Sequence, residues 1–245
     1  MVCCAMIVSA QSFSQTAKRP LPKKSTVVKT VKIKTKSKTT VQATVAKEMV
    51  SIGPKVKITT DSGVIVVKLY DSTPLHRDNF LKLVKEGFYD SLMFHRVIAG
   101  FMIQGGDPGS KHATADMMLG NGGGDMPRIP AEFRTSLFHK KGVLAAARDG
   151  NPEKASSACQ FYLVQGKVYK EEELAMMEMQ MGRKFSPAER VAYKTIGGTP
   201  FLDKNYTVYG EVISGMEVID KIASVPTGPG NRPVGDVRMK MEIIK

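Results

Sequence analysis

Few residues of this sequence have obvious catalytic potential, and most familiar catalytic arrangements are missing. The four histidines lack metal-ligand spacing, and no H-E-x-x-H, G-x-S-x-G or G-K-[ST] motif occurs. The glycine-rich run LGNGGGD at 119–125 lies in a loop rather than between a strand and a helix, which argues against dinucleotide binding. Cys159 precedes an apolar run, which favours a buried inert thiol over a nucleophile. Hydrolysis, redox chemistry and phosphoryl transfer lose support, and we expect no metal and no cofactor.

The stretch FHRVIAGFMIQGGD (Phe94 to Asp107) offers a different chemistry, because it sets Arg96 among apolar and amide side chains. A guanidinium stays charged and presents rigid N–H donors. It can therefore stabilise a polar state of a bound group without exchanging a proton.

The elements around this stretch are mostly β. After Gly53-Pro54, the segments KVKITT and VIVVKLY flank a turn at 61–63 and predict a hairpin. Six further β-like runs follow, at Met93 to Val97, Phe101 to Gly105, Gly142 to Ala147, Gln160 to Gln165, Tyr206 to Ile213 and Val237 to Ile244.

Two helices are expected to flank these strands. Ser72 or Thr73 can cap the first, with Pro74 in its opening turn and Gly87 at its end, and the second covers 216–223. We predict a mainly β fold for 51–245, a closed eight-stranded antiparallel barrel with two flanking helices.

Residues 170–194 break the β pattern and predict an inserted helical hairpin. The segment is rich in helix formers, and Ser186-Pro187-Ala188-Glu189 forms a capping box. Its methionines either pack on their own domain or form an adaptable surface for client proteins. They are Met176, Met177, Met179 and Met181.

Phe94 to Asp107 closely resembles the central signature of the cyclophilin family, with Ala99 where many members have Pro. The resemblance continues in the family's order over about 55–245. Its further motifs are IPAEF (Ile129 to Phe133), GVLAAA (Gly142 to Ala147), CQFYLV (Cys159 to Val164), FLDKNYTVYGEV (Phe201 to Val212) and GMEVID (Gly215 to Asp220). The resemblance implies the same barrel and peptidyl-prolyl cis-trans isomerase activity on proline-containing peptides and on unfolded or folding proteins.

Rotation about an X-Pro bond must cross a barrier of roughly 20 kcal/mol set by amide resonance, and no bond to another atom is made or broken. A catalyst needs an apolar slot for the proline ring and a fixed donor that favours the twisted amide. Arg96 fits the role of that donor. A binding module or holdase chaperone on the same scaffold is the alternative function.

The resemblance also implies the rest of the site. It places Phe101, Met102, Tyr162 and Leu202 around the proline ring, Gln104 and Gln160 along the peptide backbone, and His95, Ala147, Arg148, Phe201 and Tyr206 at the border of the groove. Taken singly, these residues could instead be core side chains, a structural histidine or a solvated loop charge.

Some positions depart from the family's best-known members. Phe201 stands where many eukaryotic members have Trp, and Tyr206 where they have His, so the chain is similar to the bacterial branch. Without the indole N–H we expect weak cyclosporin binding. The hydroxyl of Tyr162, where Phe is usual, requires a partner or water, and 111–126 differs from the usual loop.

The N-terminal region carries most of the charge. Residues 1–48 hold ten Lys or Arg and one Glu, a net of +9 out of +13 for the chain. We interpret 11–50 as a basic disordered linker, with attachment of 18–47 to anionic surfaces as the alternative, and expect no specific nucleic acid. The apolar run 1–10 ends in Val8-Ser9-Ala10 and fits a signal peptide for export to the periplasm. If it is not a signal, the protein is cytoplasmic. We expect a monomer without a transmembrane span.

Overall fold

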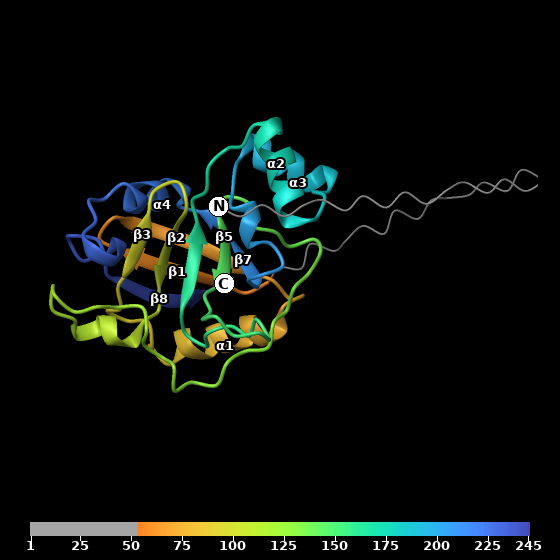
Figure 1. The fold of residues 1–245 in the computed structure, drawn as a ribbon. Coiled ribbons are helices and arrows are strands. Elements are labelled where there is room, and N and C mark those ends of the chain that lie inside the picture. Colours follow the sequence, from red (N-terminus) through yellow and green to blue (C-terminus); the bar gives the residue numbers. More distant parts are fainter. Residues whose placement is uncertain (1–52) are drawn as a thin grey trace, which may run out of the picture. The chain divides into compact units, whose positions relative to one another are not determined.

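The computed structural model describes residues 53–245, whose eight strands form one antiparallel sheet (Figure 1). The strands are β1 (Lys55–Thr60), β2 (Gly63–Leu69), β3 (Arg96–Ile98), β4 (Met102–Gly105), β5 (Val143–Ala146), β6 (Phe161–Val164), β7 (Val208–Ser214) and β8 (Met239–Ile244). Their order in the sheet is β3-β4-β6-β5-β7-β2-β1-β8. The expected hairpin and all six further strands are confirmed. The predicted signal peptide at 1–10 and linker at 11–50 lie outside the described residues.

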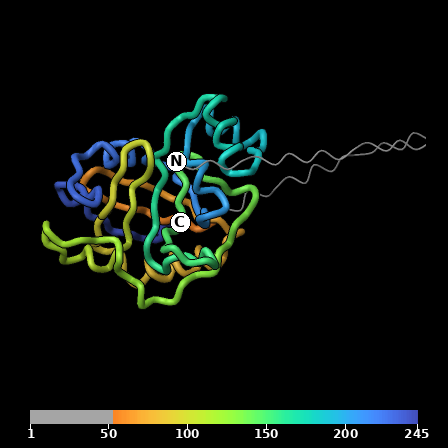
Figure 2. Tube along the Cα trace, in the orientation of Figure 1, coloured from red at the N-terminus to blue at the C-terminus, as the bar shows by residue number. Residues whose placement is uncertain are grey.

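The sheet curls, as the chain trace shows (Figure 2). Its two end strands, β3 and β8, form no ladder with each other in the described residues. A single bridge joins Met93 to Arg238, and the backbone N–H of Phe94 donates to the carbonyl of Val237 at 2.9 Å. The predicted closed barrel is thus confirmed only in part. The sheet curls, and its two edges contact each other through a few residues that precede β3.

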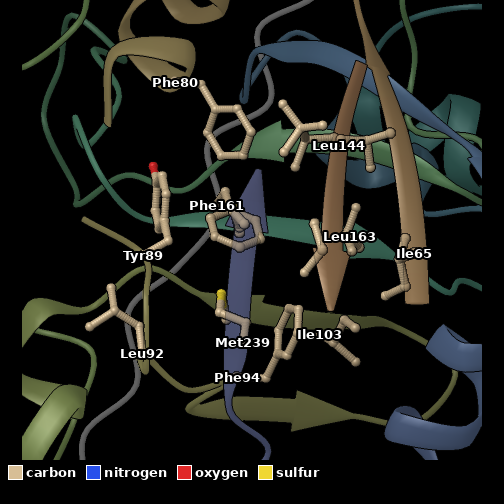
Figure 3. Close-up of a cluster of buried hydrophobic side chains, with 14 of the residues drawn as sticks. Ile65, Phe80, Tyr89, Leu92, Phe94, Ile103, Leu144, Phe161, Leu163 and Met239 are labelled. Atoms are coloured by element: carbon tan, nitrogen blue, oxygen red, sulfur yellow. The ribbon is translucent and has the colours of Figure 1, made fainter. Parts of the chain in front are cut away.

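The main core is a cluster of buried side chains on one face of the sheet (Figure 3). Alternation along β1 and β2 buries one set of side chains and leaves the other set more exposed. Phe161 of β6 lies at the centre, with its ring 5.7 Å from Phe80 and 5.6 Å from Tyr89, both in edge-on geometry. Such pairs add to the burial of apolar area that stabilises the sheet.

Helices α1 (Pro74–Lys85) and α4 (Met216–Ala223) pack against the sheet and confirm the two predicted helices. Pro74 opens α1 as expected, and Gly87 follows its end with a φ of 68°. The predicted cap at Ser72 or Thr73 is confirmed in its position but not in its hydrogen bond. Thr73 occupies the cap position, but its hydroxyl donates to the carbonyl of Tyr70 at 3.4 Å and bonds no helix N–H.

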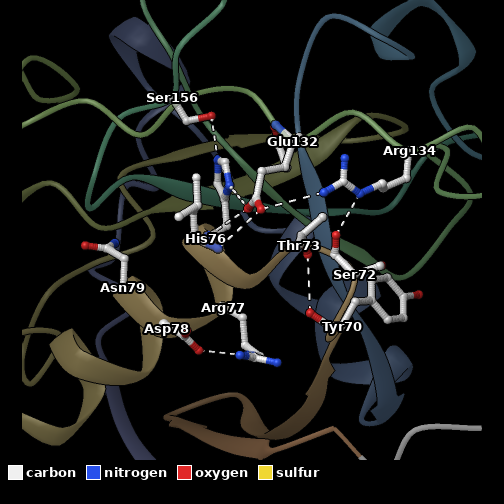
Figure 4. Close-up of polar contacts among 12 residues, drawn as sticks. Tyr70, Ser72, Thr73, His76, Arg77, Asp78, Asn79, Glu132, Arg134 and Ser156 are labelled. Carbon is white, nitrogen blue, oxygen red and sulfur yellow. Dashed lines mark hydrogen bonds and ion pairs between the residues drawn. The ribbon is translucent and has the colours of Figure 1, made fainter.

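Glu132 caps α1 instead, from a loop distant in sequence (Figure 4). Its two carboxylate oxygens accept from the backbone N–H groups of Leu75 at 3.3 Å and His76 at 3.0 Å. A carboxylate is favoured there because the first N–H groups of a helix have no partner within the helix.

Two helices, α2 (Glu171–Met181) and α3 (Pro187–Thr195), lie between β6 and β7 in the chain, in the segment 170–195 that is termed the hairpin. Ser186 and Glu189 make the predicted capping box. The hairpin packs on its own cluster of Tyr169, Leu174, Phe185 and Tyr193.

The methionines of α2 differ in burial. Met177 and Met181 pack against the hairpin cluster, whereas Met176 and Met179 are 53% and 75% exposed. The short helices η1 (Pro108–His112), η2 (Pro200–Leu202) and η3 (Pro229–Asn231) complete the fold. Within 53–245, every helix is too short or too polar to cross a lipid bilayer.

Candidate active site

A cavity of about 300 Å³ opens over β3, β4 and β6, and ten of the twelve predicted site residues line it. These ten are His95, Arg96, Phe101, Met102, Gln104, Ala147, Arg148, Tyr162, Leu202 and Tyr206. Four further residues, for which the sequence predicted no role, complete the lining: Leu119, Gly120, Asn121 and Gly230.

Strand register sets the central side chains in one row. Arg96 of β3 pairs with Gln104 of β4, and Gln104 pairs with Tyr162 of β6. Directly opposed residues of antiparallel strands lie about 5 Å apart and on the same face. The sheet therefore fixes the guanidinium, one amide and one aromatic ring side by side without help from a flexible loop.

The walls of the cavity are apolar on one side. Met102 is buried at the start of β4, and Leu202 is contributed by η2. The Arg96 guanidinium lies 5.9 Å from the centroid of the Phe101 ring. The cavity thus offers an apolar slot next to a permanent cation.

A directed chain of hydrogen bonds runs along the polar side. Arg96 Nη1 donates to Gln104 Oε1 at 3.1 Å, and Gln104 Nε2 donates to Gln160 Oε1 at 3.0 Å. Gln160 Nε2 then donates to the carbonyls of Gly120 and Gly122, both at 2.9 Å. Within 53–245 the other N–H groups of the Arg96 guanidinium have no partner, so they can donate to a bound peptide.

Gln160 lines a second cavity, of about 430 Å³, that shares Gln104 and Arg148 with the first. The loop 120–124 forms its wall, anchored by the Asp107 carboxylate, which accepts from the N–H of Gly122 at 3.3 Å. A Cβ at Gly122 would lie 2.0 Å from Asp107 Oδ1. The glycine-rich run thus allows close approach to Asp107, which explains its composition without a nucleotide.

Phe201, the other predicted residue outside the first cavity, lies at its edge. It is 45% exposed, and its ring packs 5.5 Å from that of Phe101. Arg148 is no solvated loop charge: its guanidinium lies 4.8 Å from the Tyr206 ring centroid, and Nε donates to the Asn205 carbonyl at 2.8 Å.

The Tyr162 hydroxyl has a hydrogen-bond partner, as expected for a hydroxyl at this position. It lies 2.9 Å from Nε2 of His139, a residue that the sequence analysis did not connect with the site. Burial raises the pKa of Tyr162 well above its ordinary value, so the hydroxyl keeps its proton.

His95 borders the cavity in an unusual state. It is 3% exposed, and neither ring nitrogen has a hydrogen-bond partner within 53–245. Burial lowers its pKa to about 4. The ring is therefore neutral at pH 7, and both of its nitrogens are buried.

This lowered pKa predicts acid sensitivity that His95→Phe relieves. The folded state binds fewer protons than the unfolded chain between pH 6.5 and 4, so stability falls as pH falls through that window. Between pH 7 and pH 5 the wild type should lose about 2 kcal/mol of unfolding free energy more than the variant. Urea denaturation at the two pH values measures this difference. His76 is present in both proteins, so its own contribution to the pH dependence of stability cancels in the comparison. Equal losses would refute the prediction.

A second polar cluster has the distances of a nucleophile, base and acid, yet it is structural (Figure 4). The His76 ring nitrogens lie 2.9 Å from Ser156 Oγ and 2.8 Å from Glu132 Oε2. Ser156 is 1% exposed, and the space next to His76 is only about 10 Å³. No substrate could reach the serine, and Glu132 is already committed to capping α1.

The fold and the cavity define a β-sheet protein with an apolar slot beside the guanidinium of Arg96. The model of the family described as cyclophilin type peptidyl-prolyl cis-trans isomerase matches residues 55–243. The chain belongs to that family.

Curated relatives agree with this assignment. A Streptococcus pyogenes protein named as a bifunctional phosphatase/peptidyl-prolyl cis-trans isomerase is 37% identical over 76% of this chain, which spans only 37% of that protein's length. A Staphylococcus aureus protein named as a peptidyl-prolyl cis-trans isomerase is 35% identical, with 75% of this chain and 87% of that protein covered.

Solved structures share the fold. A Cryptosporidium parvum cyclophilin type isomerase has a TM-score of 0.59 at 23% identity, covering 78% of this chain and 98% of that one. A second structure of that protein, solved in the presence of the dipeptide Ala-Pro, has a TM-score of 0.58.

Proposed function

We propose that this protein catalyses rotation of X-Pro bonds in peptides and in folding polypeptides, with Arg96 as the catalytic residue. The observation that carries the proposal is the row of Arg96, Gln104 and Tyr162 beside the apolar walls of one cavity. The proline ring occupies the apolar slot. As the amide twists, its nitrogen regains a lone pair, and an Arg96 N–H donates to it. Gln104 and Gln160 hold the backbone on either side.

The test of this proposal is two-dimensional exchange NMR on a proline-containing peptide with the intact protein. Cross-peaks between cis and trans signals should grow faster with added protein, since the uncatalysed exchange takes tens of seconds or longer. An unchanged exchange rate would remove the enzymatic function.

We also propose weak binding of cyclosporin. Phe201 lies at the rim and carries no N–H donor, so a ligand that needs an indole bond loses it. Phe201→Trp should tighten the dissociation constant by about tenfold, the factor of one hydrogen bond. Isothermal titration calorimetry compares the dissociation constants of the wild type and of Phe201→Trp. Tight binding by the wild type contradicts the proposal.

A holdase function is the second candidate, favoured by the exposed Met176 and Met179 of α2. Met176→Glu with Met179→Glu should weaken protection of an aggregating client several-fold while peptide turnover stays unchanged. Light scattering of a denatured client measures protection, and a double Glu substitution at the exposed Val64 and Ile243 is the control. Equal protection by both variants would exclude the α2 surface. Point substitutions are preferable to deletion of 170–194, because the hairpin supplies partners to buried Asp203.

We propose export to the periplasm and a monomeric state. The apolar run 1–10 ending in small residues supports export. Sequencing of the mature N-terminus and light scattering of the purified protein test the two points. Retention on heparin, with and without 18–47, tests attachment to anionic surfaces.

A further inference from the structure

Asp203 is a buried carboxylate that joins the hairpin to the sheet. It is 4% exposed and accepts from four donors. Two belong to His139, the backbone N–H at 2.8 Å and Nδ1 at 2.9 Å. Two belong to the hairpin, Arg183 Nη2 at 2.7 Å and the Tyr193 hydroxyl at 2.6 Å. Burial and the neighbouring Asp203 raise the pKa of Tyr193, so its hydroxyl remains a donor.

His139 continues the chain of bonds to the cavity. Because the Asp203 carboxylate can only accept, His139 donates to it through Nδ1–H, and this tautomer leaves Nε2 as an acceptor. The Tyr162 hydroxyl therefore donates to Nε2 at 2.9 Å. The two rings lie nearly parallel, with 6.0 Å between centroids. Tyr162 also lines the cavity, so this series of hydrogen bonds ends at the cavity wall.

We infer that Tyr193 and Arg183 of the hairpin are positioning residues for the proline cavity, acting through Asp203 and His139 on Tyr162. Tyr193, Asp203, His139 and Tyr162 are all buried, and Arg183 is 17% exposed and also donates to Glu189. The orientation of the Tyr162 ring is therefore set by groups that no substrate touches. The inference rests on the proposed isomerase function of the cavity.

Polarisation of these hydrogen bonds predicts how the loss of one donor to Asp203 affects Tyr162. Each donor to Asp203 competes for the charge of the carboxylate, and loss of one strengthens the pull on the remaining donors. Without the Tyr193 hydroxyl, His139 Nδ1–H bonds more tightly to Asp203, Nε2 becomes more basic, and the Tyr162 hydroxyl is drawn toward it. The ring that walls the cavity shifts with its hydroxyl.

The test is Tyr193→Phe, which removes one hydroxyl and leaves the ring in the hairpin cluster. Tyr169→Phe is the matched control, because Tyr169 lies in the same cluster and its hydroxyl has no bond within 53–245. We expect Tyr193→Phe to lower kcat/KM for a proline peptide about three- to tenfold, the factor carried by one ordinary hydrogen bond. The control should stay within twofold.

A double-mutant cycle decides whether the effect travels through the relay. In a Tyr162→Phe background, which lacks the last bond, Tyr193→Phe should have less than half of its effect on the logarithm of kcat/KM. Effects that simply multiply would overturn the inference. So would a loss of thermal stability with unchanged kcat/KM, since that outcome is a structural role alone.

NMR shifts of the Tyr162 ring and of the His139 ring nitrogens test the relay independently of turnover. Tyr193→Phe should move both sets of signals, and Tyr169→Phe should move neither. Unmoved signals would refute the relay even if the isomerase were active. Absent turnover in the wild type with moved signals would refute only the proposed function.

Discussion

Arg96→Ala is expected to lower kcat/KM for X-Pro rotation about 100- to 1000-fold. That factor is the cost of removing one preorganised donor from a transition state. Among residues 53–245, Arg148 is the other arginine that lines the cavity, and it is committed to the Asn205 carbonyl and the Tyr206 ring. Arg96→Ala should cost the substrate-free protein little stability, because within this part of the chain the Arg96 side chain makes one hydrogen bond, to Gln104.

The measurement is exchange NMR, which does not depend on a coupled protease. Arg96→Lys should recover only part of the loss, since an ammonium lacks the rigid planar donors of the guanidinium. Lys82→Ala, on the exposed face of α1, controls for loss of a positive charge and should leave kcat/KM unchanged. If Arg96→Ala retains more than a tenth of wild-type activity at unchanged stability, the donor mechanism is wrong.

The parts of the site that the sequence could predict are those fixed by local patterns. Arg96, Phe101, Met102 and Gln104 lie within nine residues of one another, and the antiparallel pairing of β3 with β4 brings them together. The capping box of Ser186 and Glu189 spans one helical turn and formed as predicted.

The parts that it could not predict depend on contacts between distant segments. Nothing near Tyr162 in the chain indicates that His139 receives its hydroxyl, and nothing near Asp107 indicates that it anchors Gly122. Such bonds exist because the folded sheet leaves buried polar groups that must find partners. Their identities follow from the tertiary arrangement and not from local propensity.

Glu132 is the strongest case of a distant partner, and its removal should destabilise the protein most. Glu132→Ala leaves the buried N–H groups of Leu75 and His76 and the His76 ring without their acceptor. The expected loss is about 3 to 5 kcal/mol of unfolding free energy, as for a buried charge network broken from one side. Urea denaturation at pH 7 measures it.

Two companion variants separate capping from catalysis. Glu132→Gln keeps one acceptor oxygen and should cost less than Glu132→Ala, since it can still bond one helix N–H. Ser156→Ala removes only the bond to His76 Nε2, so it should cost about 1 kcal/mol and leave isomerase activity intact. A loss of turnover in Ser156→Ala at unchanged stability would assign the cluster a chemical role. Equal stability of Glu132→Ala and wild type would mean that the start of α1 is held by the packing of Phe80 and Leu83 alone, with the carboxylate dispensable.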